Sequence, residues 1–371
     1  MKGKSSRDDW TSPGAFPVAT GVHRVPLPLP NDGLRSVNVY LLEDADSLVL
    51  IDSGRSSPES VAALESALRL LGYSFGDIRR FLITHVHRDH YTQAIALRRS
   101  FGSKIELGRG ELPSLRVYAT PGRRRLAAQL ELLSAHGAAE IADRLRAIGA
   151  GTIETHEDWE WPDDWVDADQ QVPVGKRMLR ALETPGHTRG HVVYVDEQDG
   201  LLFAGDHVLP HITPSIGFEA APVDQPLGNF LASLRRVRLL PDLRLLPAHG
   251  PVMRSSHQRI DEILEHHDIR LIDTRKAIEA GAETAVGVAQ SLRWTRRQLP
   301  LTTLDPFDQM LAVTETAAHL DLLVAQGRLR KKVIAGVYSY FPLGPNSTEA
   351  VWPGSSGAAS VDKEGGSFTW N

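Results

Sequence analysis

The sequence has no cysteine in its 371 residues. This absence excludes a disulfide-stapled fold, zinc sites with cysteine ligands, iron–sulfur clusters and a cysteine nucleophile. A composition of 42% hydrophobic and 23% charged residues is typical of a folded globular protein rather than a disordered chain. Any catalytic chemistry must therefore come from other side chains.

Long apolar runs and an excess of one charge are missing as well. The longest apolar runs, such as 48–51 and 81–83, have the length of a strand and not the roughly 20 residues of a membrane-spanning helix. The polar N-terminus lacks the apolar segment of a secretion signal, so a cytoplasmic protein without a membrane partner is expected. A formal net charge of −5 argues against a protein coated with positive charge for nucleic acid.

Histidine, by contrast, is abundant, with 15 residues. Three histidines and an aspartate form the string HVHRDH, which directly follows the predicted buried strand 78–84. Where a strand ends in a turn, the alternate residues His85 and His87 can point at one centre, and Asp89 and His90 can face a second centre beside it. Neutral imidazoles and carboxylates suit zinc, iron or manganese. The string therefore predicts a metal site.

Three further candidate ligands follow strand-like segments, each with glycine or proline fixing the turn. They are His187 in TPGHT, Asp206 in FAGDH and His249 in PAHGP. Loops at one edge of a β-sandwich meet in space and commonly carry the functional residues. We therefore expect these three side chains to converge on the histidine string.

This set of motifs resembles the metallo-β-lactamase superfamily over roughly residues 18–254. The matching features are the HxHxDH string, the lone His187, Asp206 after an apolar strand, the late His249, and Asp52 in the early motif IDSG. They occur in the order and the contexts that the family shows.

The resemblance implies two metal-binding sets joined by one carboxylate. The implied ligands of the first metal are His85, His87 and His187. The implied ligands of the second metal are Asp89, His90 and His249. Asp206 would bridge both metals, and Asp52 would orient the ligand loop without binding a metal.

The resemblance also implies an α+β fold, namely a four-layer αββα sandwich in which helices cover two mixed sheets. After Pro251 the pattern predicts mainly helices, followed by a hairpin at 328–341. This order of helices and a hairpin is similar to that of a winged helix. The predicted parts are a flexible N-terminal arm (1–15), a hydrolase domain (16–254) with a helical insertion at about 109–170, a winged-helix-like domain (255–343) and a disordered tail (344–371).

The implied chemistry is hydrolysis by a metal-bridging hydroxide. Two close divalent metals lower the pKa of a bridging water and polarise the oxygen of a carbonyl or phosphoryl substrate. Asp89 would orient the nucleophile and shuttle its proton, so no serine or cysteine nucleophile is needed. Zinc is the first expectation for the metal, with iron or manganese as alternatives.

The C-terminal appendage resembles the branch of glyoxalase II-like hydrolases and β-lactamase-like protein 2. A small carboxylic ester or thioester is the favoured substrate, with cleavage of single-stranded RNA and lactone hydrolysis as alternatives. Acidic and basic residues balance between Ser256 and Leu343, whereas nucleic-acid modules usually carry a basic excess. The opposing observation is a basic cluster on the predicted hairpin, formed by Arg328, Arg330, Lys331 and Lys332.

Several residues near the motifs keep two interpretations. His191 and His207 either support the ligands and donate a proton to the leaving group, or pack in ordinary loops. A tryptophan set in the insertion either walls the substrate pocket or anchors the insertion on the sandwich. This tryptophan set consists of Trp159, Trp161 and Trp165.

Features of the C-terminal part are interpreted as structural. Its helical histidines are expected to be solvated or interface side chains, and they are His257, His266 and His267. A winged helix can also serve as a dimerisation element, so the oligomeric state, a homodimer included, stays open.

Overall fold

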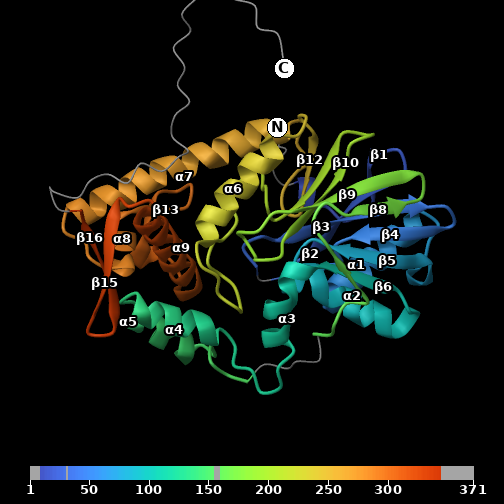
Figure 1. Cartoon of the computed structure of the whole chain (residues 1–371). Helices are drawn as coiled ribbons and strands as arrows, with labels where there is room; N and C mark the ends of the chain where they lie inside the picture. The colour runs from blue at the N-terminus through green and yellow to red at the C-terminus, as the bar shows by residue number, and fades with distance from the viewer. Residues whose placement is uncertain (1–8, 31, 154–158, 344–371) are drawn as a thin grey trace, which may run out of the picture.

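The computed structural model describes residues 9–30, 32–153 and 159–343, which are built around two β-sheets (Figure 1). The seven strands of the first sheet follow chain order. They are β1 (Phe16–Ala19), β2 (Val22–Pro28), β3 (Ser36–Asp44), β4 (Ser47–Ile51), β5 (Ile78–Ile83), β6 (Lys104–Gly108) and β7 (Asp164–Val166). The neighbours from β1 to β4 are antiparallel, and those from β4 to β7 are parallel.

The second sheet has five strands in the order β12-β11-β10-β9-β8. They are β8 (Gln171–Val174), β9 (Arg177–Glu183), β10 (Val192–Asp196), β11 (Leu201–Gly205) and β12 (Arg244–Pro247). Only the pair β11 and β12 is parallel within this sheet. Both sheets are therefore mixed, as the sequence predicts.

An apolar layer between the two sheets holds them face to face. Both sheets contribute alternate strand residues to this layer, among them Leu82 of the first sheet and Val192 of the second. Tyr40 of β3 and Phe203 of β11 meet edge-on within it, with ring centroids 5.4 Å apart.

Three helices cover the outer face of the first sheet. They are α1 (Pro58–Leu70), α2 (Arg88–Phe101) and α3 (Leu112–Tyr118). Leu64 and Leu68 of α1 and Ile95 of α2 pack with strand residues such as Phe81 in a separate apolar core. Spacings of three and four residues place such side chains on one helix face.

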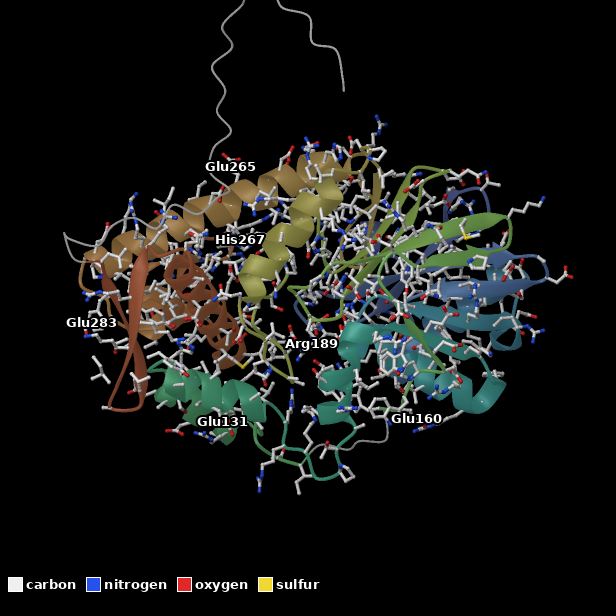
Figure 2. The ribbon with its side chains drawn as sticks, in the orientation of Figure 1. Glu131, Glu160, Arg189, Glu265, His267 and Glu283 are labelled. Atoms are coloured by element: carbon white, nitrogen blue, oxygen red, sulfur yellow. The ribbon has the colours of Figure 1, made fainter. Side chains whose placement is uncertain are left out.

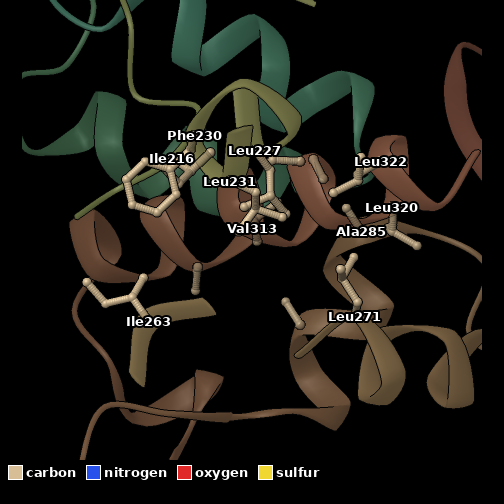
Figure 3. Packing of buried hydrophobic residues seen from close by; sticks show 14 of the residues in the cluster. Ile216, Leu227, Phe230, Leu231, Ile263, Leu271, Ala285, Val313, Leu320 and Leu322 are labelled. Atoms are coloured by element: carbon tan, nitrogen blue, oxygen red, sulfur yellow. The ribbon is translucent and has the colours of Figure 1, made fainter. Parts of the chain in front are cut away.

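Six helices lie on the side of the second sheet. They are α4 (Ala127–Ala135), α5 (Ala139–Ala147), α6 (Pro226–Arg238), α7 (Ser256–Glu279), α8 (Ala285–Ser291) and α9 (Pro306–Ala325). Phe230 of α6, Ile263 of α7 and Val313 of α9 belong to one continuous core with residues of the sheet such as Val193 (Figure 3). The predicted α+β fold with helices outside two mixed sheets is confirmed.

Short elements complete the part of the chain that the structure describes. The hairpin is formed by β15 (Leu329–Ile334) and β16 (Val337–Pro342), and a two-residue ladder by β13 (Arg293–Trp294) and β14 (Leu299–Pro300). The 3-10 turns are η1 (Asp9–Thr11), η2 (Phe75–Asp77), η3 (Arg109–Glu111) and η4 (Leu301–Thr303). The order of three helices and a hairpin after β12 agrees with the pattern in the sequence.

The C-terminal helices do not build a core of their own. Leu133 of α4, Phe230 of α6 and Leu320 of α9 share one cluster, which reaches Tyr340 of β16. The predicted boundary at residue 254 lies in the connection between β12 and α7 and does not interrupt this core. Most of the predicted arm (1–8) and the predicted tail (344–371) lie outside the described residues.

Two parts of the chain differ from the sequence-based expectation. The apolar pattern does not predict the strands β1 and β2, because Pro26 and Pro28 of β2 lack the N–H group that a strand ladder uses. The predicted insertion 109–170 is helical from α3 to α5, but its end is not an insertion. There β7 pairs in parallel with β6 and extends the first sheet.

The start of α2 also differs from the prediction, and the difference places two site residues. The apolar pattern predicts a helix at 91–100, whereas the helix begins at Arg88 after His87 as its N-cap. Asp89 and His90 therefore lie in the first helical turn, where an acidic side chain is favoured by the helix dipole. Gly102 ends the helix in the left-handed region, at φ 80°.

No helix among residues 9–30, 32–153 and 159–343 is both long enough and apolar enough to cross a membrane.

Candidate metal centre

The seven predicted ligands meet at one end of the sandwich, although they are spread along the chain. Four of them lie where β5 passes through a turn into the start of α2, while His187 follows β9, Asp206 follows β11 and His249 follows β12. Their donor atoms form two groups, and within each group the atoms lie within 4.8 Å of one another. The first group is His85, His87, His187 and Asp206. The second group is Asp89, His90 and His249.

The first group brings three imidazoles to ligand spacing. The Nδ1 atom of His87 lies 3.0 Å from the Nε2 atoms of both His85 and His187. Asp206 Oδ2 lies 3.4 Å from His187 Nε2 and 4.0 Å from His85 Nε2. Nitrogen ligands of a tetrahedral zinc ion, with bonds of about 2.0–2.1 Å, are about 3.3 Å apart.

The second group faces the other oxygen of the same carboxylate. Asp206 Oδ1 lies 3.3 Å from His249 Nε2 and 3.6 Å from His90 Nε2. Asp89 Oδ2 lies 3.4 Å from His249 Nε2 and 3.6 Å from His90 Nε2. The two oxygens of Asp206 thus point one to each group.

Hydrogen bonds on the far side of each ring fix which nitrogen faces the centre. His187 Nδ1 donates to the Ser215 carbonyl at 2.8 Å, and His249 Nδ1 donates to the Ser36 carbonyl at 2.7 Å. Carbonyl oxygens only accept, so both Nδ1 atoms carry the proton and both Nε2 atoms of the neutral rings present a lone pair. This arrangement is typical of metal-binding histidines.

Asp52 orients the turn after β5 through hydrogen bonds to Thr84 and His90. Its side chain accepts from the Thr84 N–H at 2.8 Å and the Thr84 hydroxyl at 3.0 Å, and its Oδ2 lies 2.8 Å from His90 Nδ1. The Thr84 hydroxyl gives its proton to Asp52, so His85 Nδ1, at 3.1 Å, donates to that hydroxyl. Asp52 itself takes the left-handed conformation, with φ 60°, directly after β4.

The residues fit divalent metal ions. His90 Nε2, His249 Nε2 and Asp206 Oδ1 are buried and have no hydrogen-bond partner among the residues that the structure describes. An unpaired buried polar atom is costly, and three of them around one point are satisfied together by a cation. His87 Nδ1 also faces two lone pairs at 3.0 Å, and a single ring proton can serve only one of them.

Electrostatics differ between the two groups: the His87 ring of the first group stays neutral, whereas His90 of the second group faces carboxylates. Burial lowers the pKa of His87 to about 3, so its ring keeps a lone pair at neutral pH. Burial lowers the pKa of His90, but the carboxylates of Asp52, Asp89 and Asp206 outweigh it and raise the pKa to about 10. In the second group the negative charge of the carboxylates therefore favours a cation.

His191 and His207 lie behind the ligands. His191 Nε2 accepts from the Asp206 N–H at 3.2 Å, and His191 Nδ1 lies 2.9 Å from the Thr184 hydroxyl. His191 thereby holds the backbone of the carboxylate between the two groups. His207 is fully buried and packs edge-on against Phe230 at 5.3 Å, so packing is the interpretation that its contacts favour.

Two glycines allow the second sheet to bring its ligands so close. Gly205 has φ +50°, and a Cβ atom there would lie 2.7 Å from His191 Nε2 and from Thr84 Oγ1. Gly186 has φ +145°, and a Cβ atom there would lie 2.4 Å from the Cα atom of Phe230 on α6. Only glycine fits these positions next to Asp206 and His187.

Sequence analysis missed a buried carboxyl pair beside the ligand loops. Glu111 is fully buried and accepts a hydrogen bond from the Thr188 hydroxyl, next to His187. Burial raises the pKa of Glu111 to about 7, and burial together with Glu111 raises the pKa of Glu219 to about 8. The available signal was the position of Glu111 directly after β6, at the strand edge where the other site residues lie.

A surface cavity of about 410 Å³ adjoins the loop that carries His187. Arg189 and Arg109 line it together with Asn229 of α6. Figure 2 shows Arg189 in the middle of the molecule, near the upper end of α3. Arg109 is paired with Asp167, and the charge of Arg189 acts on the buried Glu111 and Glu219.

Of the tryptophan set, Trp159 anchors its segment on the sandwich, whereas Trp161 is exposed. Trp159 is 5% exposed and stacks on Tyr118 of α3, with ring centroids 4.2 Å apart. Arg88 of α2 lies over the same indole at 5.4 Å. Trp161 and Trp165 contact each other edge-on at 6.2 Å.

Comparison with known proteins agrees with this geometry. The family described as "Metallo-beta-lactamase superfamily" matches residues 32–249. The probable metallo-hydrolase YqjP of Bacillus subtilis is 26% identical over 331 residues, which cover 82% of this chain and 91% of that protein.

Other curated relatives match over a smaller share of their length. The beta-lactamase-like protein 2 homolog of Caenorhabditis elegans is 25% identical, over 63% of this chain and 62% of that protein. The atrochrysone carboxyl ACP thioesterase of Aspergillus fumigatus is 25% identical, over 67% of this chain and 47% of that protein.

Two solved structures are similar over most of the chain. A metallo-beta-lactamase family protein from Thermus thermophilus has a TM-score of 0.71 at 27% identity, and covers 88% of this chain and all of its own. A beta-lactamase domain protein from Burkholderia ambifaria has a TM-score of 0.73 at 28% identity, and covers 89% of this chain and 93% of its own.

Proposed function

The chain belongs to the metallo-beta-lactamase superfamily, and we propose that it is a dinuclear metal-dependent hydrolase of small carboxylic esters or thioesters. The observation that carries this proposal is the position of Asp206. Its two oxygens face two separate groups of donor atoms, at 3.4 Å from His187 Nε2 and at 3.3 Å from His249 Nε2. One carboxylate between two donor groups is the arrangement expected for two adjacent metal ions.

The ligand sets follow from the two groups of donor atoms. His85, His87 and His187 would hold the first metal, and Asp206 would bridge to the second. The further ligands of the second metal would be Asp89, His90 and His249. Zinc suits this set of imidazoles and carboxylates, and when bound, two such ions supply an activated water at neutral pH and polarise the substrate carbonyl.

Asp89 is the candidate for handling the proton. Its side chain is 20% exposed, whereas those of His90 and His249 are 0% and 3% exposed. Asp89 is thus the member of the second group that a substrate can approach. Burial opposes ionisation of Asp89, but His90 and His249 outweigh it and lower the pKa, so the carboxylate is ionised at neutral pH and can accept a hydrogen bond from the attacking water.

The structure supports a small substrate over nucleic acid. Two members of the basic cluster on the β15–β16 hairpin already have partners. Lys331 donates to Asp321 at 2.8 Å and also lies 3.8 Å from the centroid of the Tyr338 ring. Arg330 donates to the Pro342 carbonyl at 3.2 Å. Cations that are already engaged by α9 or by the hairpin itself contribute less to phosphate binding than free ones. A thioesterase among the relatives favours the ester or thioester class.

The test is a side-by-side turnover assay of the zinc-loaded full chain. Substrates are an acyl-CoA, an acyl-glutathione, a simple lactone and single-stranded RNA, each with wild type and with Asp89→Asn. We expect thioester or ester turnover that falls by about 10²–10⁴-fold in the variant, the usual contribution of a positioned acid or base. RNA cleavage that disappears in the variant, without ester or thioester turnover, would overturn the ranking.

A further inference from the structure

A third group of candidate ligands lies outside the proposed centre, between α7 and α9. His266 and His267 belong to α7, and Glu315 belongs to α9. One donor atom from each lies within 4.8 Å of the other two. Figure 2 labels His267 on the stretch of α7 that runs alongside α6. Of the two positions expected for the helical histidines, solvated or at an interface, His267 is fully buried and packs against Phe230 of α6 and His319 of α9.

A chain of hydrogen bonds fixes the protonation of His267. His319 Nδ1 donates to the Glu315 carbonyl at 2.8 Å, so the Nε2 atom of the neutral His319 ring is an acceptor. His267 Nδ1 lies 3.1 Å from that acceptor and must donate to it. The proton of His267 is thereby used on one side of the ring, and His267 Nε2 presents a lone pair on the other side.

That lone pair has no hydrogen-bond partner. His267 Nε2 is buried and accepts from none of the described residues. Burial also lowers the pKa of His267 well below its usual value, so the ring stays neutral at neutral pH. A neutral imidazole whose other nitrogen donates to a neighbouring acceptor has the arrangement of a metal ligand.

Arg270 interacts electrostatically with Glu315, but the two side chains form no close ion pair. Arg270 lies one turn further along α7, where it donates to the Arg293 carbonyl at 3.0 Å and lies 4.2 Å from the ring centroid of Trp294. Within the described part of the chain, no ion pair to Glu315 is formed by Arg270 or another base. Burial raises the pKa of Glu315 and the charge of Arg270 opposes that rise, so its oxygens can face a cation without breaking a close ion pair.

We propose that His266, His267 and Glu315 form a zinc site that ties α7 to α9. Two imidazoles and one carboxylate, with a water in the fourth position, match the ligands that zinc prefers. The donor atoms lie within 4.8 Å of one another, and ligands of a closed tetrahedral zinc site are about 3.3 Å apart. His266 is exposed and Glu315 is half-buried, so both can rotate toward the fixed nitrogen of His267.

The decisive experiment counts zinc in the full chain after chelator stripping, reloading and dialysis. To separate this site from the proposed catalytic centre, the background variant carries His87→Ala and His249→Ala. We expect about one equivalent of zinc to remain in that background and to disappear when Glu315→Gln and His266→Asn are added. These two side chains are not fully buried, so the folded state is expected to persist, which circular dichroism verifies.

A matched control is His257→Asn, which changes a histidine on the same helix outside the group and should leave the zinc count unchanged.

Cobalt substitution gives a second readout, because loss of His267 in His267→Phe should remove the absorption bands of the α7–α9 site. His319→Phe should weaken zinc binding by about 10–100-fold, since it removes the group that orients His267.

A background that retains no zinc, or a zinc count that survives Glu315→Gln with His266→Asn, would overturn the proposal. Neither result bears on hydrolysis, which is assayed separately with the wild-type centre intact. Conversely, the zinc count expected for the site between α7 and α9 does not depend on the outcome of the ester and thioester assays.

Discussion

The two sheets supply the candidate metal centre in different ways. The first sheet delivers four donor residues from one turn, His85 to His90, in which β5 passes into the first turn of α2. The second sheet delivers His187, Asp206 and His249 singly, each from the end of a different strand. One side is therefore a local structure, and the other is assembled from segments far apart in the chain.

The two sides of the centre are therefore held in place by different contacts. The turn after β5 is braced locally by Asp52 and Thr84, whose contacts lie at its base. The loop of His249 is instead held by the first sheet, since the Asn38 side chain donates to the Pro247 and Gly250 carbonyls at 3.0 and 2.8 Å. Its position depends on how the two sheets pack.

Asp206 is the point at which the two sides depend on each other, so its loss is expected to have the largest effect. Asp206→Asn keeps the size of the side chain but removes the charge that faces both donor groups. We expect at least about a 10³-fold fall in kcat/KM, equivalent to several kcal/mol, together with loss of bound metal. Steady-state kinetics and metal analysis measure both quantities.

The control for that change is Glu197→Gln, which removes an exposed carboxylate in the turn after β10 that pairs with Arg180 at 3.2 Å. It should change kcat/KM less than twofold, because exposed ion pairs contribute little. If Asp206→Asn retained full metal content and activity, the bridge between the two sides would be refuted.

Asp52 tests the local bracing of the first side. Asp52→Ala removes the acceptor of Thr84 and the partner of His90 Nδ1 while leaving all seven donor residues in place. We expect metal affinity to fall by about 10–100-fold, the usual cost of losing such an orienting group. Titration with a fluorescent chelator measures it, and an unchanged affinity would show that the turn is held by other contacts.

Gly186 tests the assembled side through stability. In Gly186→Ala, the new Cβ atom would overlap the backbone of Phe230 on α6, so the β9 loop and the helix must separate. We expect the free energy of unfolding to fall by about 3 kcal/mol or more. The control Gly72→Ala also has positive φ but meets no atom within 4 Å, so it should cost only about 1–2 kcal/mol. Urea unfolding compares the two, and equal losses would contradict the overlap.

The smallest effect is expected from the buried carboxyl pair beside the ligand loops. Burial and Glu111 raise the pKa of Glu219 to about 8 in the folded protein, above its ordinary value. The folded state then binds more protons than the unfolded state, so this group reduces stability progressively as the pH rises from about 4.5 to about 8. Glu219→Gln should flatten that decline, with a gain on the order of 1–2 kcal/mol at pH 8 and little change at pH 5.

Urea unfolding at both pH values checks this expectation against Glu279→Gln, which changes a carboxylate of α7 away from the pair. A gain that is the same at pH 5 and pH 8 would point to packing rather than to titration of Glu219.

The fold and the ligand residues were predictable to different degrees. Strand ends, turn glycines and the HVHRDH string are local signals, and the resemblance built on them predicted the sandwich correctly. The prolines of β2 concealed a strand, because its partners β1 and β3 supply the stabilising contacts that local pattern does not show. The position of Glu111 after a strand was a usable signal, but the burial of Glu111 and His267 was not predictable, since it is created by distant segments such as the loop at Thr188 and helix α9.

The core on the side of the second sheet has a consequence for synthesis of the chain. Its members run from Leu130 of α4 to Tyr340 of β16, and the Tyr340 N–H donates to the Glu283 carbonyl at 2.7 Å. The apolar core of the first sheet, in contrast, is formed mainly by residues before Trp165. During translation the first half can bury its core early, while Val193 and Phe230 wait for nearly the whole chain. A ribosome that stalls before residue 340 would hold an incomplete core, and this nascent chain is the form that chaperones would need to shield.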